Sequence, residues 1–255
     1  LSAKDLTHPR LAEVTPVPPR RILVLGANGQ LGLALRAEYA DAAHVEFASQ
    51  ADLDLTSPDL PSARRWRDYS AIINAAAYTA VDAAETAEGR RDAWAANVTG
   101  VVALARVAAE NDITLVHVSS DYVFDGAADA AYREDDPLCP LGVYGQTKAA
   151  GDAAVTTAPR HLVVRTSWVI GEGRNFVRTM ASLAERGVDP SVVDDQVGRL
   201  TFTDDLARGI RHLIEAGVPS GVYNLTGSGA PASWARVAKW GFELTGNDPA
   251  RVTPV

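Results

Sequence analysis

The sequence predicts an α/β protein built on a Rossmann-type doubly wound parallel sheet, with a smaller C-terminal lobe. Short apolar segments alternate with segments of helical periodicity from residue 21 to residue 168, and strands separated by helices form parallel sheets with right-handed crossovers. A glycine-rich segment directly follows the first apolar segment. Beyond residue 168 the alternation becomes less regular, which indicates a smaller unit over residues 169–255 that is interleaved with the main sheet.

Each element of this fold is predicted from its apolar pattern. The apolar segment 21–25 stops at Gly26, as a buried parallel strand does. In chain order, strands are expected at 21–25, 44–48, 71–74, 113–118, 161–166, 191–194 and 222–225, and helices at 31–39, 92–110, 144–155, 176–186, 204–215 and 233–244. Residues 1–20 hold four prolines in a polar stretch and are expected to form a tail or linker.

Composition and charge argue against several functional classes. The net charge of −8 disfavours non-specific binding to nucleic acid or to an anionic membrane. Cys139 is the one cysteine in the sequence, so no internal disulfide can form. No run of about 18 apolar residues and no apolar signal segment occur, so a cytoplasmic location is expected. No spacing typical of metal ligands stands out, and no metal is predicted.

The segment from Gly26 to Gly32 has the pattern G-x-x-G-x-x-G between a predicted strand and a predicted helix. Glycine allows positive φ angles and a close approach of the backbone to a pyrophosphate, which the N-terminus of the helix then stabilises. The pattern predicts that residues 21–168 form a dinucleotide-binding domain; the alternative is a tight turn that needs glycine only for packing. The expected cofactor contacts in this loop are Gly26, Asn28, Gly29, Gln30, Leu31 and Gly32.

The choice of nicotinamide cofactor depends on the end of the second strand. NAD-selective sites usually have an acidic residue there, which binds the ribose. The strand 44–48 is followed by Ser49 and Gln50 instead. The missing acid favours NADPH, with NADH as the alternative, although no arginine is evident for the 2′-phosphate. Asp54 and Leu55 are expected to contact the adenine, and the alternative for Asp54 is a helix cap.

Tyr144 and Lys148 are the candidates for proton transfer. Their spacing of four places them on one face of the predicted helix 144–155. A free tyrosine has a pKa of about 10, and a nearby ammonium is expected to lower that pKa by favouring the phenolate. Reduction of a ketone needs a hydride at carbon and a proton at oxygen, which such a tyrosine can supply. Lys148 can also bind the ribose of the cofactor; the alternative is a helix pair on the surface.

Two predicted strands end in residues that should meet at one edge of the sheet. Ser120 follows the strand 113–118, and Asn74 ends the strand 71–74. Ligands bind at the carboxyl ends of the strands in open α/β sheets, so the Ser120 hydroxyl can donate a hydrogen bond to a ketone oxygen. The residues expected to line the cofactor site after Asn74 are Ala75, Ala76 and Ala77.

The glycine spacing resembles that of the extended short-chain dehydrogenases/reductases, which place an asparagine at the position of Asn97 to support the lysine. The chain further resembles the dTDP-4-dehydrorhamnose reductases in the segments 26–32, 74–82, 119–124, 143–148, 165–168 and 195–198. The resemblance implies reduction of the 4-keto group of a dTDP-6-deoxy-L-hexulose to dTDP-L-rhamnose by hydride transfer from NAD(P)H. The family often has threonine where this chain has Ser120, and the hydroxyl is kept.

The same resemblance implies roles for individual residues. Ser120, Tyr144 and Lys148 would be catalytic, and Asn97 would join the cofactor site. Residues 169–255 would be mainly a substrate-binding lobe. The implied substrate contacts are Thr79, Val81, Ser120, Asp121, Tyr122, Tyr144, Trp168 and Asn175. For Trp168 the alternative is a tryptophan of the apolar core, and for Asp121 it is a helix cap.

Partners and competing functions follow from the resemblance as well. The expected partner is a dTDP-linked 4-keto deoxysugar. Residues 1–12 resemble the end of a dTDP-4-dehydrorhamnose 3,5-epimerase, which implies a fusion or an association with that enzyme, and the chain is a candidate for a homodimer. One alternative function is a sister reductase on another nucleotide-linked keto sugar, of the dihydrostreptose type. The other is a non-catalytic NADP-binding regulatory subunit, like that of methionine adenosyltransferase; the intact Ser120, Tyr144 and Lys148 weigh against it.

Overall fold

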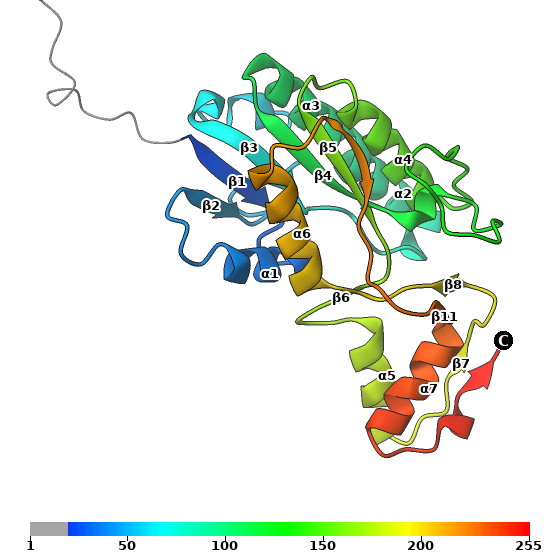
Figure 1. The fold of residues 1–255 in the computed structure, drawn as a ribbon. Coiled ribbons are helices and arrows are strands. Elements are labelled where there is room, and N and C mark those ends of the chain that lie inside the picture. Colours follow the sequence, from blue (N-terminus) through cyan, green and yellow to red (C-terminus); the bar gives the residue numbers. More distant parts are fainter. Residues whose placement is uncertain (1–19) are drawn as a thin grey trace, which may run out of the picture.

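The computed structural model describes residues 20–255, so the predicted tail or linker 1–20 lies outside the described residues except for Arg20. The centre of the molecule is a six-stranded parallel sheet with the strand order β10-β5-β4-β3-β1-β2 (Figure 1). Its strands are β1 (Arg21–Leu25), β2 (Val45–Ala48), β3 (Tyr69–Asn74), β4 (Thr114–Ser120), β5 (His161–Thr166) and β10 (Gly221–Asn224).

The order of the strands creates the opening in which a ligand can bind. β2 lies on one side of β1 and β3 lies on the other, so the connections that leave β1 and β3 diverge at the carboxyl edge of the sheet. Residues 49–68 form turns and two short 3-10 helices where the common Rossmann order would place a further strand. The loops after β1 and β3 therefore flank the opening.

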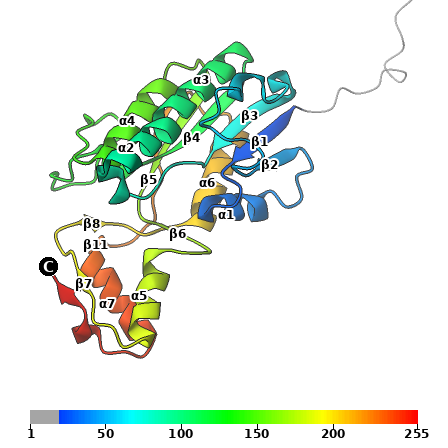
Figure 2. The ribbon, with the colours of Figure 1, turned by 180° about the vertical axis from the view of Figure 1, so that it is seen from behind.

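Helices cover both faces of the sheet (Figures 1 and 2). Val24 and Leu35 belong to the apolar core on one face, and Ile72 and Leu104 to the core on the other. The first face carries α1 (Gln30–Glu38) and α6 (Thr203–Glu215), and the second carries α3 (Gly100–Glu110) and α4 (Val143–Val155), with α2 (Ala87–Trp94) beside α4. Helices on both faces of a parallel sheet are the predicted doubly wound arrangement.

The predicted helix 92–110 is interrupted in the structure. The helical segment begins earlier, with α2, because the Thr86 hydroxyl accepts a hydrogen bond from the Gly89 N–H at 3.0 Å and caps the helix. A π-helical turn, Ala95–Thr99, then separates α2 from α3. Such turns occur often at functional sites, and this one carries the buried Asn97.

A smaller unit lies beyond the carboxyl edge of the sheet (Figures 1 and 2). In it α5 (Phe176–Glu185) packs on α7 (Trp234–Leu244) around a separate apolar core that includes Met180, Ala238 and Phe242. Three short strand pairs complete this unit and its connections: β6 (Val169–Ile170) with β9 (Thr201–Phe202), β7 (Ser191–Val192) with β12 (Thr253–Pro254), and β8 (Val197–Gly198) with β11 (Ala232–Ser233). Between β9 and β11 the chain returns to the main sheet as α6 and β10.

Apart from the interrupted helix 92–110, the structure contains every predicted strand and helix, although their ends differ by a few residues. The strands that the sequence did not predict are only two residues long, which is too short to produce a period. Within residues 20–255, no helix combines the length and the apolar character that crossing a membrane requires.

Candidate active site

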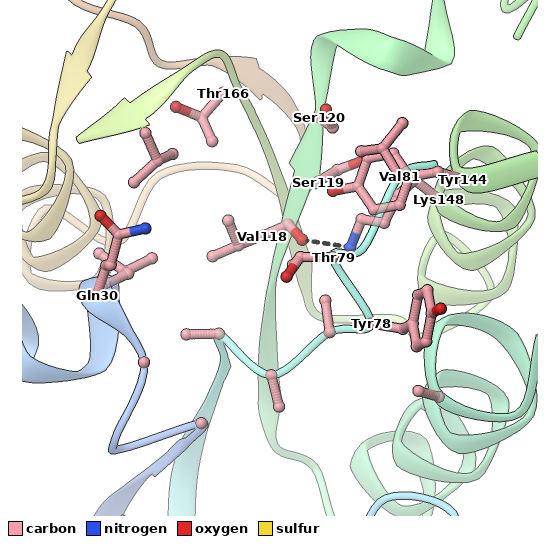
Figure 3. A pocket seen from close by; sticks show the side chains of 18 of the residues that line it. Gln30, Tyr78, Thr79, Val81, Val118, Ser119, Ser120, Tyr144, Lys148 and Thr166 are labelled. Carbon is pink, nitrogen blue, oxygen red and sulfur yellow. Dashed lines mark hydrogen bonds between the residues drawn. The ribbon is translucent and has the colours of Figure 1, made fainter. Parts of the chain in front are cut away.

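A cleft of about 990 Å³ opens between the carboxyl edge of the sheet and the smaller unit. Figure 3 shows Gln30 on one side of it, and Ser120, Tyr144 and Lys148 together on the other. All the predicted site residues except Gly32 and Asn97 line this cleft, namely Gly26, Asn28, Gly29, Gln30, Leu31, Asp54, Leu55, Ala75, Ala76, Ala77, Thr79, Val81, Ser120, Asp121, Tyr122, Tyr144, Lys148, Trp168 and Asn175.

The glycine loop has the backbone that an anion site needs. Gly26 has a φ of +78°, and a Cβ on it would lie 2.7 Å from the backbone nitrogen of Ala76, so a side chain is excluded there. Gly29 precedes α1 and provides no side-chain cap, which leaves the first N–H groups of the helix available to an anion at the cleft. Gly32 serves packing instead, because a Cβ on it would lie 2.2 Å from the carbonyl oxygen of Gly26.

The cleft also contains a polar group that lacks a partner in the described part of the chain. The hydroxyl of Thr166 is buried, lines the cleft and forms no hydrogen bond within residues 20–255. A buried hydroxyl without a partner is costly, so Thr166 is suited to bind a polar ligand. The Ser119 hydroxyl instead lies beside the Asp152 carboxylate and lowers its pKa, although burial raises that pKa overall. Together with the glycine loop, Thr166 fits a nicotinamide dinucleotide.

The end of the cleft beside β2 is lined by Ser49, Gln50, Asp54 and Leu55. The Asp54 carboxylate accepts hydrogen bonds from the backbone N–H and the hydroxyl of Thr56, both at 2.8 Å. These bonds lower the pKa of Asp54. The carboxylate of Asp54 thus closes a local turn, while the residue itself also borders the cleft.

Tyr144 lies in the first turn of α4, with its ring edge-to-face against Tyr122 at 5.6 Å. Burial raises the pKa of Tyr144 to about 12; the neighbouring Ser120 hydroxyl partly offsets this, and the Asp121 carboxylate adds to it. The prediction that Lys148 lowers this pKa is therefore wrong for the structure as it stands, because burial dominates and the lysine amine is directed to the backbone of β4. Tyr144 is held as a neutral phenol, which is the form that donates a proton.

Lys148 is almost fully buried, at 1% exposure. Its Nζ donates a hydrogen bond to the carbonyl oxygen of Val118 at 2.7 Å and lies 3.3 Å from Nε2 of His117. Burial lowers the pKa of Lys148 to about 8, while the Asp152 carboxylate raises it. Burial of a lysine amine between α4 and β4 costs desolvation free energy. A buried lysine with a shifted pKa that borders a cleft is typical of a functional group rather than of a packing residue.

Asn97 has partners other than the predicted one. Its amide donates to the carbonyl oxygen of Tyr78 at 3.1 Å and to the hydroxyl of Thr147 at 3.0 Å, and its oxygen accepts from the Tyr78 N–H at 2.9 Å. It therefore ties the π-helical turn to α4 and to the loop after β3. Asn97 does not line the cleft, and none of these bonds joins it directly to Lys148.

The aromatic side chains of the smaller unit close the far wall of the cleft. Trp168 has a positive φ of 43°, which is unusual for a residue with a side chain, and stacks on Trp234 with 3.6 Å between ring centroids. Phe176 packs against the same Trp234 at 4.5 Å. One face of Trp168 is thus covered by Trp234, and both rings border the cleft.

Two further predicted contacts are shaped by local bonds. The Asn175 side chain caps α5 by accepting from the Arg178 N–H at 2.9 Å and donates to the Gly171 carbonyl at 2.8 Å. Asp121 accepts from the Ser120 hydroxyl at 3.1 Å, and burial raises its pKa to about 6. Asp121 is therefore a carboxyl group in the cleft that titrates close to neutrality.

Sequence reasoning missed His117 and Trp234. His117 is a polar residue within the apolar strand β4, and that contrast was the available signal. Trp234 begins α7, far along the chain from every predicted motif, and no local pattern connects it to the site. Within residues 20–255, no group of three or more His, Cys, Asp or Glu side chains is placed to hold a metal ion.

Comparison with known proteins gives consistent matches over the described chain. A family model described as the RmlD substrate binding domain matches residues 20–255. A dTDP-4-dehydrorhamnose reductase of Mycobacterium tuberculosis is 41% identical over 243 residues, which cover 92% of this chain and 79% of the relative. One of Sinorhizobium fredii is 39% identical over 239 residues, covering 89% of this chain and 80% of the relative.

Solved structures match in the same way. The dTDP-4-dehydrorhamnose reductase of Clostridium acetobutylicum superposes with a TM-score of 0.85 at 37% identity, covering 92% of this chain and 83% of that protein. The reductase of Bacillus anthracis, solved in complex with NADP, gives a TM-score of 0.83 at 33% identity, covering 93% and 84%.

Proposed function

This chain belongs to the RmlD family of dTDP-4-dehydrorhamnose reductases, and we propose that it reduces the 4-keto group of a dTDP-6-deoxy-L-hexulose to give dTDP-L-rhamnose. The observation that supports this most strongly is the placement of Tyr144, Ser120 and Lys148 on one wall of a cleft whose other end is a glycine loop. A neutral phenol beside a hydroxyl donor is the arrangement that protonates a ketone oxygen.

NADPH is the proposed cofactor, with NADH as the alternative. The loop at Gly26, the first turn of α1 and the Thr166 hydroxyl would hold it, and a related reductase has been solved with NADP. When bound, NADPH supplies the hydride. The three alanines Ala75–Ala77 are small enough to leave room for the dinucleotide along the cleft.

Within the chain, Tyr144 is the proposed proton donor to the substrate oxygen. The Ser120 hydroxyl donates to Asp121 in this structure; on substrate binding it would turn to donate to the same oxygen and thereby stabilise the charge that develops on it. Lys148 would bind the ribose and favour the return of a proton to Tyr144, because its pKa of about 8 lets it exchange protons near neutrality. Asp121 would remain close enough to Tyr144 to influence its proton affinity.

Residues 21–168 are the proposed dinucleotide-binding domain, and residues 169–255 mainly the substrate-binding lobe, with α6 and β10 returned to the main sheet. Trp168 and Trp234 offer apolar surface for the deoxysugar at the far wall. Thr79, Val81, Tyr122 and Asn175 are the further proposed substrate contacts, and all four line the cleft. A cytoplasmic location, a homodimer and association with a 3,5-epimerase stay predictions.

The test is an assay of the purified protein with a panel of 4-keto nucleotide sugars and with both NADPH and NADH. We expect NADPH to be oxidised when the epimerised 4-keto dTDP-sugar is present. Oxidation with a different nucleotide sugar only would identify the sister reductase. Tight NADPH binding without oxidation on any sugar would favour the regulatory subunit.

A further inference from the structure

A chain of hydrogen bonds connects the loop that borders the cleft to the buried amine of Lys148. The Ala76 N–H donates to the side-chain oxygen of Asn74 at 3.2 Å. The amide nitrogen of Asn74 lies 3.1 Å from Nδ1 of His117, and Nε2 of His117 lies 3.3 Å from Nζ of Lys148. The three side chains come from β3, β4 and α4, so this series of hydrogen bonds crosses the core of the domain.

His117 is fully buried, and each of its two ring nitrogens lies within hydrogen-bond distance of a partner. Its strand neighbours in β4 are Val116 and Val118, so an apolar side chain would satisfy the fold at lower cost. Across from it, Gly151 of α4 is required by the Asn97 carbonyl oxygen, which would lie 2.6 Å from a Cβ, and not by the imidazole, whose Nε2 would lie at an ordinary contact distance of 3.5 Å. The imidazole is therefore placed for its hydrogen bonds and not for its volume.

The directions of these bonds fix the tautomer of His117. Because the Asn74 oxygen accepts from Ala76, its amide nitrogen faces His117, and an amide nitrogen can only donate. Nδ1 must then be the acceptor, and the ring proton lies on Nε2. This N–H points at Nζ of Lys148, and it forms a hydrogen bond there only when Nζ is a neutral amine with a free lone pair.

Protonation of Lys148 disturbs this arrangement. An ammonium would place two donors against each other at Nε2 unless the imidazole changed tautomer. That change needs the Asn74 amide to rotate, which would break the bond to Ala76 at the edge of the cleft. An added proton on Lys148 therefore costs a hydrogen bond somewhere along the chain.

We propose that His117 is a positioning residue that holds Nζ of Lys148 beside the Val118 carbonyl and weakens its proton affinity through Nε2–H. The catalytic importance of this effect rests on the proposed reductase function, whereas the effect of His117 on the pKa of Lys148 does not. A lysine so held exchanges protons near neutral pH, which is the property its proposed role needs. Burial lowers the pKa of Lys148 in the same direction.

Other charged groups act on the same amine and must be separated from His117. On α4, the Asp152 carboxylate raises the pKa of Lys148. Asp152 is itself paired with Arg165 of β5 at 3.0 Å. The Tyr144 phenol lies one helical turn before Lys148 and is neutral below its pKa of about 12. None of these groups is changed by a substitution at position 117.

The sequence makes a direct test possible, because it contains only three lysines, Lys4, Lys148 and Lys239, and five histidines. Carbon-13 labelling of lysine and nitrogen-15 labelling of histidine allow nuclear magnetic resonance to follow Lys148 and His117 in the full chain without substrate. The variant is His117→Gln, whose amide oxygen can accept from an ammonium. The control is His161→Gln, at the start of β5, where Nδ1 lies 2.6 Å from the Ala158 carbonyl.

In the native protein above the pKa of Lys148, which is about 8, we expect an unprotonated Nδ1 and a protonated Nε2 on His117. In His117→Gln we expect the pKa of Lys148 to rise by about one unit, a tenfold gain in proton affinity, with the same displacement in the pH dependence of kcat/KM. His161→Gln should change neither. A protonated Nδ1 on His117 in the native protein at a pH where Lys148 is neutral would overturn the proposal without any variant.

An unchanged Lys148 titration in a folded His117→Gln would overturn it as well. If the native protein shows no reductase activity but Lys148 moves as expected, the proposed function fails and the positioning role of His117 stands. If the native protein is active but the pKa of Lys148 does not change in His117→Gln, the positioning role of His117 fails and the proposed function stands.

Discussion

Replacement of Asp121 by asparagine should stabilise the protein at alkaline pH. Burial raises the pKa of this carboxyl group from its ordinary value of 3.8 to about 6, against the opposing effect of the Ser120 hydroxyl. The folded state thus holds the proton more tightly than the unfolded state does. Its stabilising contribution is complete below the unfolded pKa and is lost as the pH rises through about 6.

The magnitude follows from the size of that rise. A change from 3.8 to about 6 corresponds to about 3 kcal/mol for a fully buried group. Asp121 is only partly removed from solvent, which reduces the expected gain in unfolding free energy for Asp121→Asn to about 1 to 3 kcal/mol at about pH 8. The gain should shrink as the pH falls and vanish below about pH 4, where both side chains are neutral.

Urea denaturation of the native protein and of Asp121→Asn over a series of pH values measures this difference. The control is Asp125→Asn, because a hydrogen bond from the Tyr132 hydroxyl lowers the pKa of that carboxylate. Loss of the Asp125 carboxylate should destabilise the protein at pH values where that carboxylate is ionised. This effect is opposite in sign to the stabilisation expected for Asp121→Asn. A difference for Asp121→Asn that does not depend on pH, or a loss of stability at alkaline pH, would refute the reasoning.

Two other substitutions test the loop and the core. Gly26→Ala should weaken NADPH binding and lower the free energy of unfolding by more than the control Gly126→Ala. Both glycines have φ above +70°. A Cβ at Gly26 would lie 2.7 Å from the Ala76 nitrogen, whereas a Cβ at Gly126 would have no atom within 4 Å. Isothermal titration and urea denaturation measure both effects, and equal losses would argue against the clash. Asp152→Asn should lower the free energy of unfolding by about 3 to 5 kcal/mol, because the buried Arg165 loses the carboxylate that balances its charge. Asp205→Asn, which breaks an exposed pair with Arg208, should change it little. Similar changes in the free energy of unfolding for the two variants would show that the buried pair stabilises the protein no more than the exposed pair does.

The sequence predicted the features whose causes are local. Gly26 is needed for one backbone angle and one close approach, and both depend on residues near the end of a strand. The spacing of Tyr144 and Lys148 puts them on one helix, whatever packs against it. The same holds for the strands of the sheet, whose apolar segments are short and separated by clear periodic helices.

The features that depend on packing between distant elements could not be predicted. Whether Lys148 acts on Tyr144 or on the backbone is decided by how α4 packs on β4, and this packing brings its amine to the Val118 carbonyl. Asn97 is turned towards Thr147 by a π-helical turn that no propensity indicates. The Trp168–Trp234 stack joins a residue after β5 to the start of α7, so neither residue alone reveals it.

The central claim is that Tyr144 gives the proton to the keto oxygen while the cofactor gives the hydride. It is tested most directly by Tyr144→Phe, which keeps the ring against Tyr122 and removes only the hydroxyl. Turnover of the epimerised 4-keto dTDP-sugar with NADPH should fall by at least about a hundredfold, the usual contribution of a general acid, while the Kd for NADPH stays close to that of the native protein. Turnover equal to that of the native protein would contradict the claim.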